Sequence, residues 1–187
     1  SSISMHVVHN PPVPGVIALH EQIHDGSKID IHGHVEHGHH HNFTVELLSG
    51  PHVVLHIDFR FQHEHEIVMN SFSHNAWGME VRHHNPLRSG DHFHLHIHCK
   101  HHGYDIELNG HHLAHFPHRH NMSSVQVIGL KGGVHVKEVK FHGFHFRHSW
   151  GHGHATIDFG HGGYNGYGTS SYNAPVFNGG HTYNAYW

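Results

Sequence analysis

Short runs of alternating apolar and polar residues fill the first 141 positions of the chain. In residues 92–99, every second residue is apolar and the others are histidine. The apolar positions are Phe93, Leu95, Ile97 and Cys99, and the histidines are His92, His94, His96 and His98. Because successive side chains of a strand point to opposite faces of a sheet, this run predicts a strand with an apolar inner face and a row of four histidines outside.

The same alternation predicts two further strands. Residues 53–61 place His56, Asp58 and Arg60 together on one face of a strand. The predicted inner face is Val53, Leu55, Ile57, Phe59 and Phe61. Residues 134–141 alternate in the same way if a bulge interrupts the strand near Lys137 and Glu138.

Turn-forming pairs separate these runs. They are Asp25-Gly26, Ser49-Gly50, Ser89-Gly90, Asn109-Gly110 and Gly132-Gly133. Many short runs between such turns predict an all-β domain of antiparallel strands, which we place at residues 1–141.

The composition changes after this point. Residues 142–187 contain ten glycines and are rich in tyrosine, asparagine and histidine, which is typical of a low-complexity tail. Aromatic side chains bury a large area at low entropic cost, so we expect those of the tail to act as anchors. The candidate anchors for self-association are Trp150, Tyr164, Tyr167, Tyr172, Tyr183 and Trp187. The alternative is a tail that folds back on its own domain.

Histidine dominates the charge of the chain. There are 36 histidines, and the net charge is −4 while they are neutral; full protonation would give −4 + 36 = +32. Unperturbed histidines titrate at about pH 6.5, so the net charge of the chain becomes positive only at acidic pH. We therefore expect no nucleic-acid binding at neutral pH. The sequence also lacks an apolar run of about 18 residues, so we expect no membrane insertion.

A second group of polar residues follows the 53–61 run. Asn70 lies in the apolar run 67–72, and Trp77, Glu80 and Arg82 come shortly after it. A tryptophan ring packs on the apolar face of a sugar, and charged side chains bind its hydroxyls, so this set suits a carbohydrate. The alternative is a solvated ladder of ion pairs, since Asp58 with Arg60 and Glu80 with Arg82 can simply pair.

These residues resemble the signature of the galectins, which are β-galactoside-binding lectins with a two-sheet jelly-roll sandwich. The family pattern reads H-x-N-x-R, V-x-N and W-x-x-E-x-R. Residues 56–60, 68–70 and 77–82 supply every position except Asp58, where the family has asparagine. The resemblance covers roughly residues 10–141 and implies a galectin-like β-sandwich that requires no cofactor.

The resemblance also implies roles for the site residues. The implied carbohydrate-binding set is His56, Asp58, Arg60, Val68, Asn70, Trp77, Glu80 and Arg82. In that reading His56 and Arg60 contact the C4 hydroxyl and ring side of galactose, and Trp77 stacks on it. Asn70 and Glu80 hold its C6 hydroxyl, and Glu80 and Arg82 reach the neighbouring sugar. Asp58 accepts hydrogen bonds but cannot donate one at neutral pH, so it bears on which galactoside is preferred.

The histidine load needs a separate explanation. Two histidines at His-x-His spacing on a strand can chelate Zn²⁺ or Cu²⁺, and the row His92, His94, His96 and His98 is the best candidate. A pH switch and a merely polar surface are the alternatives. The sequence has no His-Glu-x-x-His motif, P-loop or Gly-x-Ser-x-Gly motif, and Cys99 is expected to be a buried apolar residue, so we expect no enzyme.

Two functions remain open. The first is a β-galactoside-binding lectin made multivalent by self-association. The second is a structural, matrix or fibre-forming protein on a galectin-like scaffold, with cohesion set by histidine, metal and pH. The first 30 residues show no signal peptide. We expect an extracellular protein exported by an unconventional route, with the cytoplasm as the alternative.

Overall fold

The structure is a computed structural model, and it describes residues 5–146, 150, 156–158, 164, 167–169 and 172. Nearly all regular structure in these residues is β, as predicted. The single-turn 3₁₀ helix η1 spans Met122–Ser124. No helix in the described part of the chain has the length and apolar character that crossing a membrane requires.

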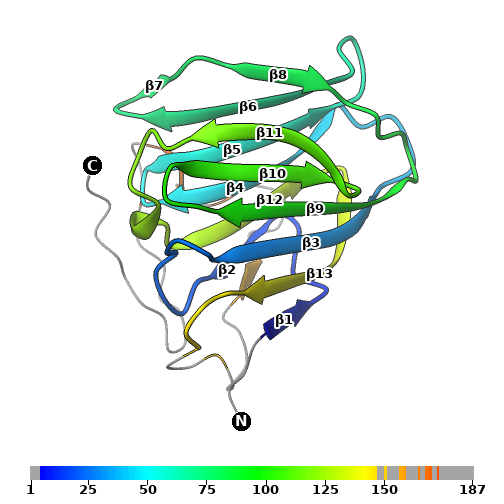
Figure 1. Ribbon diagram of the computed structural model, residues 1–187. Coiled ribbons are helices and arrows are strands. Elements are labelled where there is room, and N and C mark those ends of the chain that lie inside the picture. Colours follow the sequence, from blue (N-terminus) through cyan, green and yellow to red (C-terminus); the bar gives the residue numbers. More distant parts are fainter. Residues whose placement is uncertain are drawn as a thin grey trace.

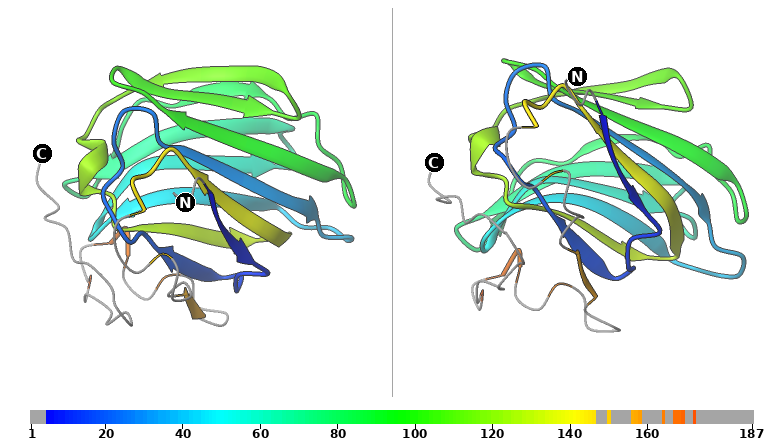
Figure 2. Two further views of the ribbon diagram at one scale, coloured as in Figure 1. Left: turned by 60° about the horizontal axis from the view of Figure 1, so that its bottom comes forward. Right: turned by 90° about the horizontal axis from the view of Figure 1, so that it is seen from below.

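The strands form two antiparallel sheets that pack face to face (Figure 1). The six-stranded sheet has the order β1-β13-β3-β9-β10-β11. Its strands are β1 (Met5–His9), β13 (Val134–His142), β3 (Lys28–Val35), β9 (His92–Cys99), β10 (Gly103–Leu108) and β11 (His111–Pro117). Turned views show the two curved sheets as stacked layers (Figure 2).

The eight-stranded sheet has the order β14-β2-β12-β4-β5-β6-β7, and β8 also pairs with β6. Its strands are β14 (Thr156–Asp158), β2 (Gly15–Ala18), β12 (Val127–Gly132), β4 (Asn42–Ser49), β5 (His52–Arg60), β6 (Glu66–Ser73), β7 (Ala76–Trp77) and β8 (Val81–His84). The predicted all-β sandwich of two antiparallel sheets is thus confirmed.

The inner faces of the two sheets form one apolar core. Phe93, Leu95, Ile97 and Cys99 of β9 are buried in it, and the histidines of the same strand lie on the other face, as predicted. The bulge near Lys137 is also confirmed, because the register of β13 against β3 shifts between Val136 and Glu138. The alternation of the sequence therefore sets the side of the sheet on which these residues lie.

The prediction was wrong for Val53. Leu55, Ile57 and Phe59 face the core as expected, but Val54 joins them there. Val53 instead packs on the outer side of the sheet with Leu48 and Val127. The cause is an irregularity between Val53 and His56 in the pairing with β6, which breaks the two-residue period at the start of β5.

The core continues past residue 141, where the sequence predicts the tail to begin. His142 is the last residue of β13, and Phe144 and Trp150 are buried in the main core. Trp150 is fully buried and its ring contacts those of His6, His20 and Phe141. Strand β14 then pairs with β2 and extends the edge of the eight-stranded sheet.

A candidate carbohydrate-binding groove

A groove lies on the outer face of the eight-stranded sheet, over β5, β6 and β7. It encloses about 320 Å³ and is lined by His56, Arg60, Val68, Asn70, Trp77, Gly78 and Glu80. The strand register brings these residues together, since His56 pairs with Asn70 and Asp58 pairs with Val68. Val68 also pairs with Arg82 across the other edge of β6. Six of the eight predicted site residues therefore line one groove.

His56 is held in place from below by Glu46 of β4. The Nδ1 atom of His56 lies 2.7 Å from Glu46 Oε2, and Lys131 Nζ lies 3.4 Å from Glu46 Oε1. Burial would raise the pKa of Glu46, but the hydrogen bond and charge of His56 and the charge of Lys131 outweigh it and lower the pKa. An ionised Glu46 accepts a hydrogen bond from Nδ1–H, which leaves Nε2 as the ring nitrogen that can accept a hydrogen bond from a hydroxyl.

Asp58 is buried, and both oxygens of its carboxylate accept hydrogen bonds from neighbouring side chains. It accepts a 2.7 Å hydrogen bond from Asn42 Nδ2 and a 2.9 Å hydrogen bond from Arg60 Nε. The side chain that departs from the galectin pattern therefore holds Arg60 against β5. Asp58 lines an adjoining hollow of about 460 Å³, which shares Arg60 with the groove.

An ion-pair ladder borders the groove. Arg60 Nη1 donates to Glu64 at 2.9 Å, and Arg82 Nη1 donates to the same carboxylate oxygen at 3.0 Å. Arg82 also pairs with Glu80 at 2.7 Å. Both pairs that the ion-pair alternative expected are present, and Glu64 joins them into one row. Paired charges hold these side chains in fixed positions, which is compatible with binding a polar ligand beside them.

Asn70 braces the segment that carries Trp77. Its Nδ2 donates to the Gly78 carbonyl at 2.9 Å, and its Oδ1 accepts from Arg119 at 2.8 Å. Arg119 also donates to the Met79 carbonyl at 2.6 Å. A Cβ at Gly78 would lie 2.7 Å from Arg119 Nη1, so a larger residue at this position would require the Arg119 guanidinium to move.

Trp77 presents its ring at the edge of the groove. The turn before it contains His74 and Asn75, both with positive φ, which is typical of a two-residue hairpin. The Trp77 side chain is 52% exposed and contacts the rings of His56 and Phe72, with centroids 4.8 and 5.1 Å away. An aromatic surface supported on one side and open on the other can accept the apolar face of a sugar.

Sequence reasoning missed three residues that support this groove. Glu46 lies on the neighbouring strand, Glu64 in the loop after β5, and Arg119 after β11. Only Glu64 had a local signal, because it follows Arg60 closely in a polar loop. The other two reach the groove through strand pairing and through a contact between segments far apart in the sequence.

Two described tyrosines from the segment after residue 141 cover the sheet beside the groove. Tyr164 and Tyr167 are buried against Val16, Leu48, Val53 and Val127 on the outer side of the eight-stranded sheet. A Cβ at Gly129 would lie 2.7 Å from the Tyr164 ring, so this glycine makes room for it. Lys131 lies 4.7 Å from the centre of the same ring.

This packing bears on the predicted self-association residues. Trp150, Tyr164 and Tyr167 are buried on their own chain, and Tyr172 is half-buried, with its hydroxyl 3.3 Å from Gln126 Oε1. Their contacts are those that the alternative of a folded-back tail expects, and self-association through these four residues stays a prediction. Tyr183 and Trp187 lie outside the described residues.

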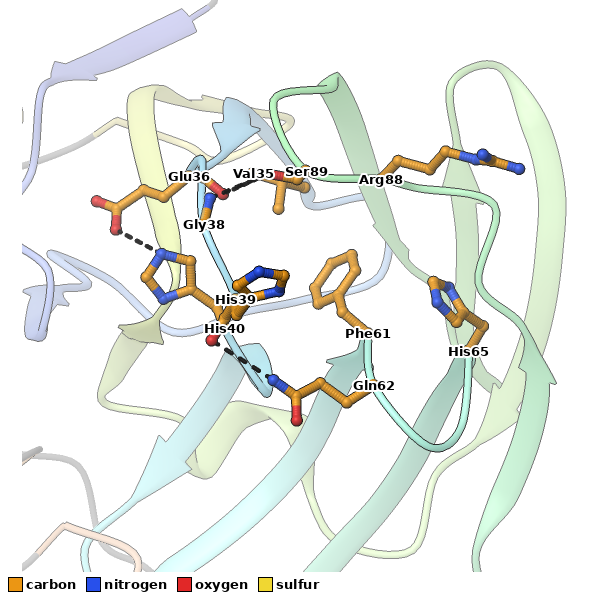
Figure 3. Close-up of a pocket in the computed structure, with 10 residues that line it drawn as sticks. All are labelled: Val35, Glu36, Gly38, His39, His40, Phe61, Gln62, His65, Arg88 and Ser89. Carbon is orange, nitrogen blue, oxygen red and sulfur yellow. Dashed lines mark hydrogen bonds and ion pairs between the residues drawn. The ribbon is translucent and has the colours of Figure 1, made fainter.

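A separate pocket of about 360 Å³ lies where the loops after β3 and β5 meet the loop before β9 (Figure 3). Phe61 forms an apolar wall, and His39 and His65 flank it. Ser89 bridges this region, since it donates to the Glu36 carbonyl and accepts from Gly38. This pocket is distinct from the groove and contains none of the predicted site residues.

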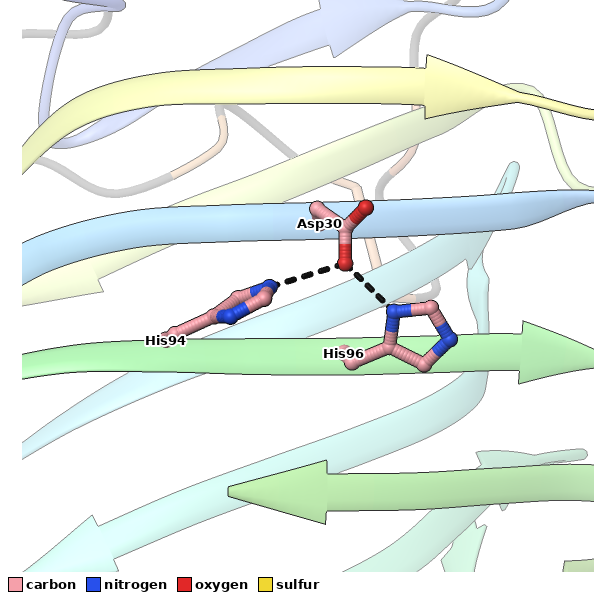
Figure 4. A group of neighbouring side chains, drawn as sticks. All are labelled: Asp30, His94 and His96. Carbon is pink, nitrogen blue, oxygen red and sulfur yellow. Dashed lines mark hydrogen bonds and ion pairs between the residues drawn. The ribbon is translucent and has the colours of Figure 1, made fainter. Parts of the chain in front are cut away.

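The histidine row of β9 lies on the outer face of the six-stranded sheet, and its members differ in their surroundings. His94 Nε2 is 2.9 Å from Asp30 Oδ1, and His96 Nδ1 makes a short hydrogen bond to the same oxygen (Figure 4). His142 Nε2 lies 3.0 Å from the other oxygen of Asp30. Burial would raise the pKa of Asp30, but the hydrogen bonds to His94 and His96 outweigh it and lower the pKa.

His92 and His98 lie outside this cluster. The His92 ring faces His34, with centroids 5.3 Å apart, and the His98 ring faces His96 at 6.0 Å. Sequence reasoning missed Asp30, which belongs to β3 and becomes a neighbour only because it pairs with His96 across the two strands.

Comparisons with known proteins agree with this geometry. The sequence model of a family described as Galactoside-binding lectin matches residues 14–141. The chain is 54% identical over 182 residues to "Probable galaptin lec-8" of Caenorhabditis elegans, covering 97% of this chain and 99% of that protein. It is 39% identical over 154 residues to "Probable galaptin lec-7" of the same organism, covering 82% and 86%.

A solved structure shares the fold. The crystal structure of Caenorhabditis elegans galectin LEC-6 is 27% identical and aligns with a TM-score of 0.67, covering 74% of this chain and 96% of that one. The alignment with lec-8 spans nearly the whole chain, so most of the residues after 141 take part in that similarity.

Proposed function

The chain belongs to the galectin family of galactoside-binding lectins, which are not enzymes and need no cofactor, and on this premise we propose that it binds β-galactoside glycans in the groove over β5, β6 and β7. One observation carries the proposal: His56, Arg60, Val68, Asn70, Trp77 and Glu80 line the same groove. These six positions match the family signature.

The chemistry of the groove suits this ligand. The exposed Trp77 ring offers an apolar surface for the C–H face of galactose. His56 Nε2 accepts a hydrogen bond from a sugar hydroxyl while Glu46 binds its Nδ1–H. Arg60 donates a hydrogen bond to a sugar oxygen while Asp58 binds its Nε. A site with fixed hydrogen-bonding groups around one hydroxyl discriminates strongly against the epimer.

Asp58 supports the site indirectly in this proposal. The family asparagine is replaced by a carboxylate that binds Arg60 and Asn42. Asp58 therefore tunes the affinity through the position of Arg60, and the sugar itself meets the Arg60 guanidinium.

The test is binding to immobilised lactose at pH 7.5 in EDTA, challenged by free lactose and by free sucrose. We expect lactose alone to release the protein, and Trp77→Ala to abolish retention. The matched control is Met79→Ala, because Met79 is 83% exposed on the same segment but does not line the groove. A folded wild-type protein that is not retained, or one that sucrose releases equally well, would overturn the proposal.

We propose a second function, in which copies of the chain associate through their histidine-rich surfaces with Zn²⁺ or Cu²⁺. The supporting observation is the outer face of the six-stranded sheet, where rings of β3, β9 and β13 lie against one another. The centroids of His32 and His94 are 4.1 Å apart, and those of His34 and His135 are 5.1 Å apart. Association would make a single-site lectin multivalent, and it would suit an extracellular matrix or fibre.

Sedimentation of the full chain with Zn²⁺, with Cu²⁺ and with EDTA tests this association. We expect larger species with either metal and their loss in EDTA. A chain truncated after Tyr172 removes Tyr183 and Trp187 and keeps the buried Trp150, Tyr164 and Tyr167, so it separates aromatic from histidine association. A monomer under every condition would overturn the second function and leave the lectin proposal untouched.

A further inference from the structure

We propose that Asp30, His94 and His96 form a specific zinc-binding site on the six-stranded sheet, with His142 orienting the Asp30 carboxylate. The inference refines the second proposed function, because it names one site among many histidines, and it holds whether or not copies of the chain associate. The three residues lie on the six-stranded sheet and the groove lies on the eight-stranded sheet, so zinc binding here is independent of the lectin function.

The convergence of ligand atoms is the first argument. The ligand atoms of Asp30, His94 and His96 all lie within 4.8 Å of one another, and among the described residues no other group of three or more such side chains is found. Zinc binds histidine nitrogen and carboxylate oxygen at about 2.0–2.2 Å. Small side-chain rotations would place an ion between the three atoms that Figure 4 shows pointing toward one another.

The placement of the three residues is the second argument. Asp30 and His96 are direct cross-strand partners in the β3–β9 pairing, and His94 stands two residues along the same strand. The backbone hydrogen bonds between two paired strands hold the three ligands at a fixed spacing. Ligands on loops are placed less precisely.

His142 supplies the outer support that such sites use. Its Nε2 lies 3.0 Å from Asp30 Oδ2, on the side of the carboxylate away from His94 and His96. A partner on the second oxygen fixes the orientation of a ligating carboxylate, and loss of such a partner typically weakens metal binding about 10–100-fold.

The site also has an entrance and an open position. Asp30 is mostly buried, while the side chains of His94 and His142 are 43% and 33% exposed. Three protein ligands leave the fourth tetrahedral position of zinc for a water molecule. Imidazole and carboxylate ligands suit zinc, and copper is the competitor with higher intrinsic affinity.

Zinc titration of the EDTA-stripped full chain against a chromophoric chelator tests the proposal. We expect one tight zinc per chain above a background of weaker sites. His94→Ala/His96→Ala and Asp30→Asn should remove the tight class, and His142→Ala should weaken it about tenfold. Co²⁺ in place of Zn²⁺ should give the visible absorption of a tetrahedral ion in the wild type and not in His94→Ala/His96→Ala.

The matched control is His101→Ala/His102→Ala, which also removes two histidines, at the turn after β9. The proposal is overturned if this control loses as much tight zinc as His94→Ala/His96→Ala, because zinc would then be spread over many histidines. It is also overturned if only Cu²⁺ binds tightly. Circular dichroism reports whether each variant is folded, and lactose retention reports the groove separately.

Discussion

On the outer face of the eight-stranded sheet, Arg60 and Arg82 alternate with the carboxylates of Asp58, Glu64 and Glu80. On the outer face of the six-stranded sheet, histidine rings lie against one another around Asp30. The first face has charges that are present throughout the neutral range. The second has charges that depend on protonation or on a bound metal.

This difference separates two kinds of binding within one sandwich. Arginine and carboxylate pairs keep the groove ready for a neutral sugar at any pH near neutrality. The charge of the histidine face changes with pH and with bound metal. Its strands belong to the other sheet, which meets the sheet of the groove through the apolar core. The two faces should therefore respond independently to metal and to mutation.

Acid is expected to have the largest effect. Among the described residues, burial lowers the pKa of six histidines, and four of these lie on the six-stranded sheet. Burial lowers the pKa of His6, and burial followed by the charges of His135, His92 and His37 lowers that of His34. Both are neutral in the folded and unfolded chain above about pH 6.5, so their stabilisation is complete there. As the pH falls, the unfolded chain takes up protons first, and the free energy of unfolding decreases.

Urea unfolding between pH 7.5 and 5 measures this loss. His6→Leu/His34→Asn should give a shallower dependence than the wild type, whereas His111→Asn, on the exposed start of β11, should not. A free energy of unfolding that stays constant down to pH 5 would contradict the expectation.

Zinc should have the next largest effect, with the opposite sign. At a free concentration 100 times its Kd, a ligand that binds only the folded state stabilises it by about 2.7 kcal/mol, which is about 5–10 °C in Tm for a chain of this size. We expect this shift in the wild type and its loss in His94→Ala/His96→Ala, measured by thermal unfolding. An equal change in lactose affinity on adding zinc would show that the two faces are coupled and would break the comparison.

Glu46→Ala should damage the groove face. It leaves the largely buried His56 Nδ1 without its carboxylate, at a cost of about 2 kcal/mol in the free energy of unfolding, whereas the exposed Lys131 ammonium can be hydrated. Lactose affinity should fall about tenfold, because the His56 ring loses its orientation, and calorimetry measures this change.

Glu138→Ala is the control on the other face. Glu138 pairs with Lys140 at 3.5 Å near the surface, and such pairs contribute about 0–1 kcal/mol. We expect unchanged lactose affinity. If the two variants weakened lactose binding equally, Glu46 would have no particular role at His56.

Asp58→Asn should have the smallest effect. The amide oxygen of the new asparagine can still accept the hydrogen bond from Arg60. Its NH₂ group then faces the NH₂ group of Asn42, so we expect a loss of about 1 kcal/mol in the free energy of unfolding. The double variant Asn42→Asp/Asp58→Asn exchanges donor and acceptor and should restore stability, which a double-mutant cycle by urea unfolding measures. Additive losses would refute this pairing.

Local patterns predicted the features that depend on neighbours in sequence. The alternation in residues 92–99 placed four apolar residues inside, and the spacing of residues 134–141 required the bulge that β13 contains. Val53 was misplaced because the irregularity that turns it outward depends on the pairing of β5 with β6.

The supporting residues of both faces depend on contacts between distant segments. Arg119 reaches the carbonyl of Met79 and the side chain of Asn70 from another part of the chain. Asp30 meets His96 only through the register of β3 against β9. Trp150 lies in a glycine-rich segment, where composition predicts a tail, yet its ring is fully buried. No local pattern reports such pairings.

Calorimetric titration of lactose into the EDTA-treated full chain at pH 7.5, beside Trp77→Ala, tests the central claim most directly. The groove predicts one lactose per chain for the wild type and no measurable binding for the variant. No heat of binding from a folded wild type, or equal binding by both proteins, would contradict a galactoside site in the groove.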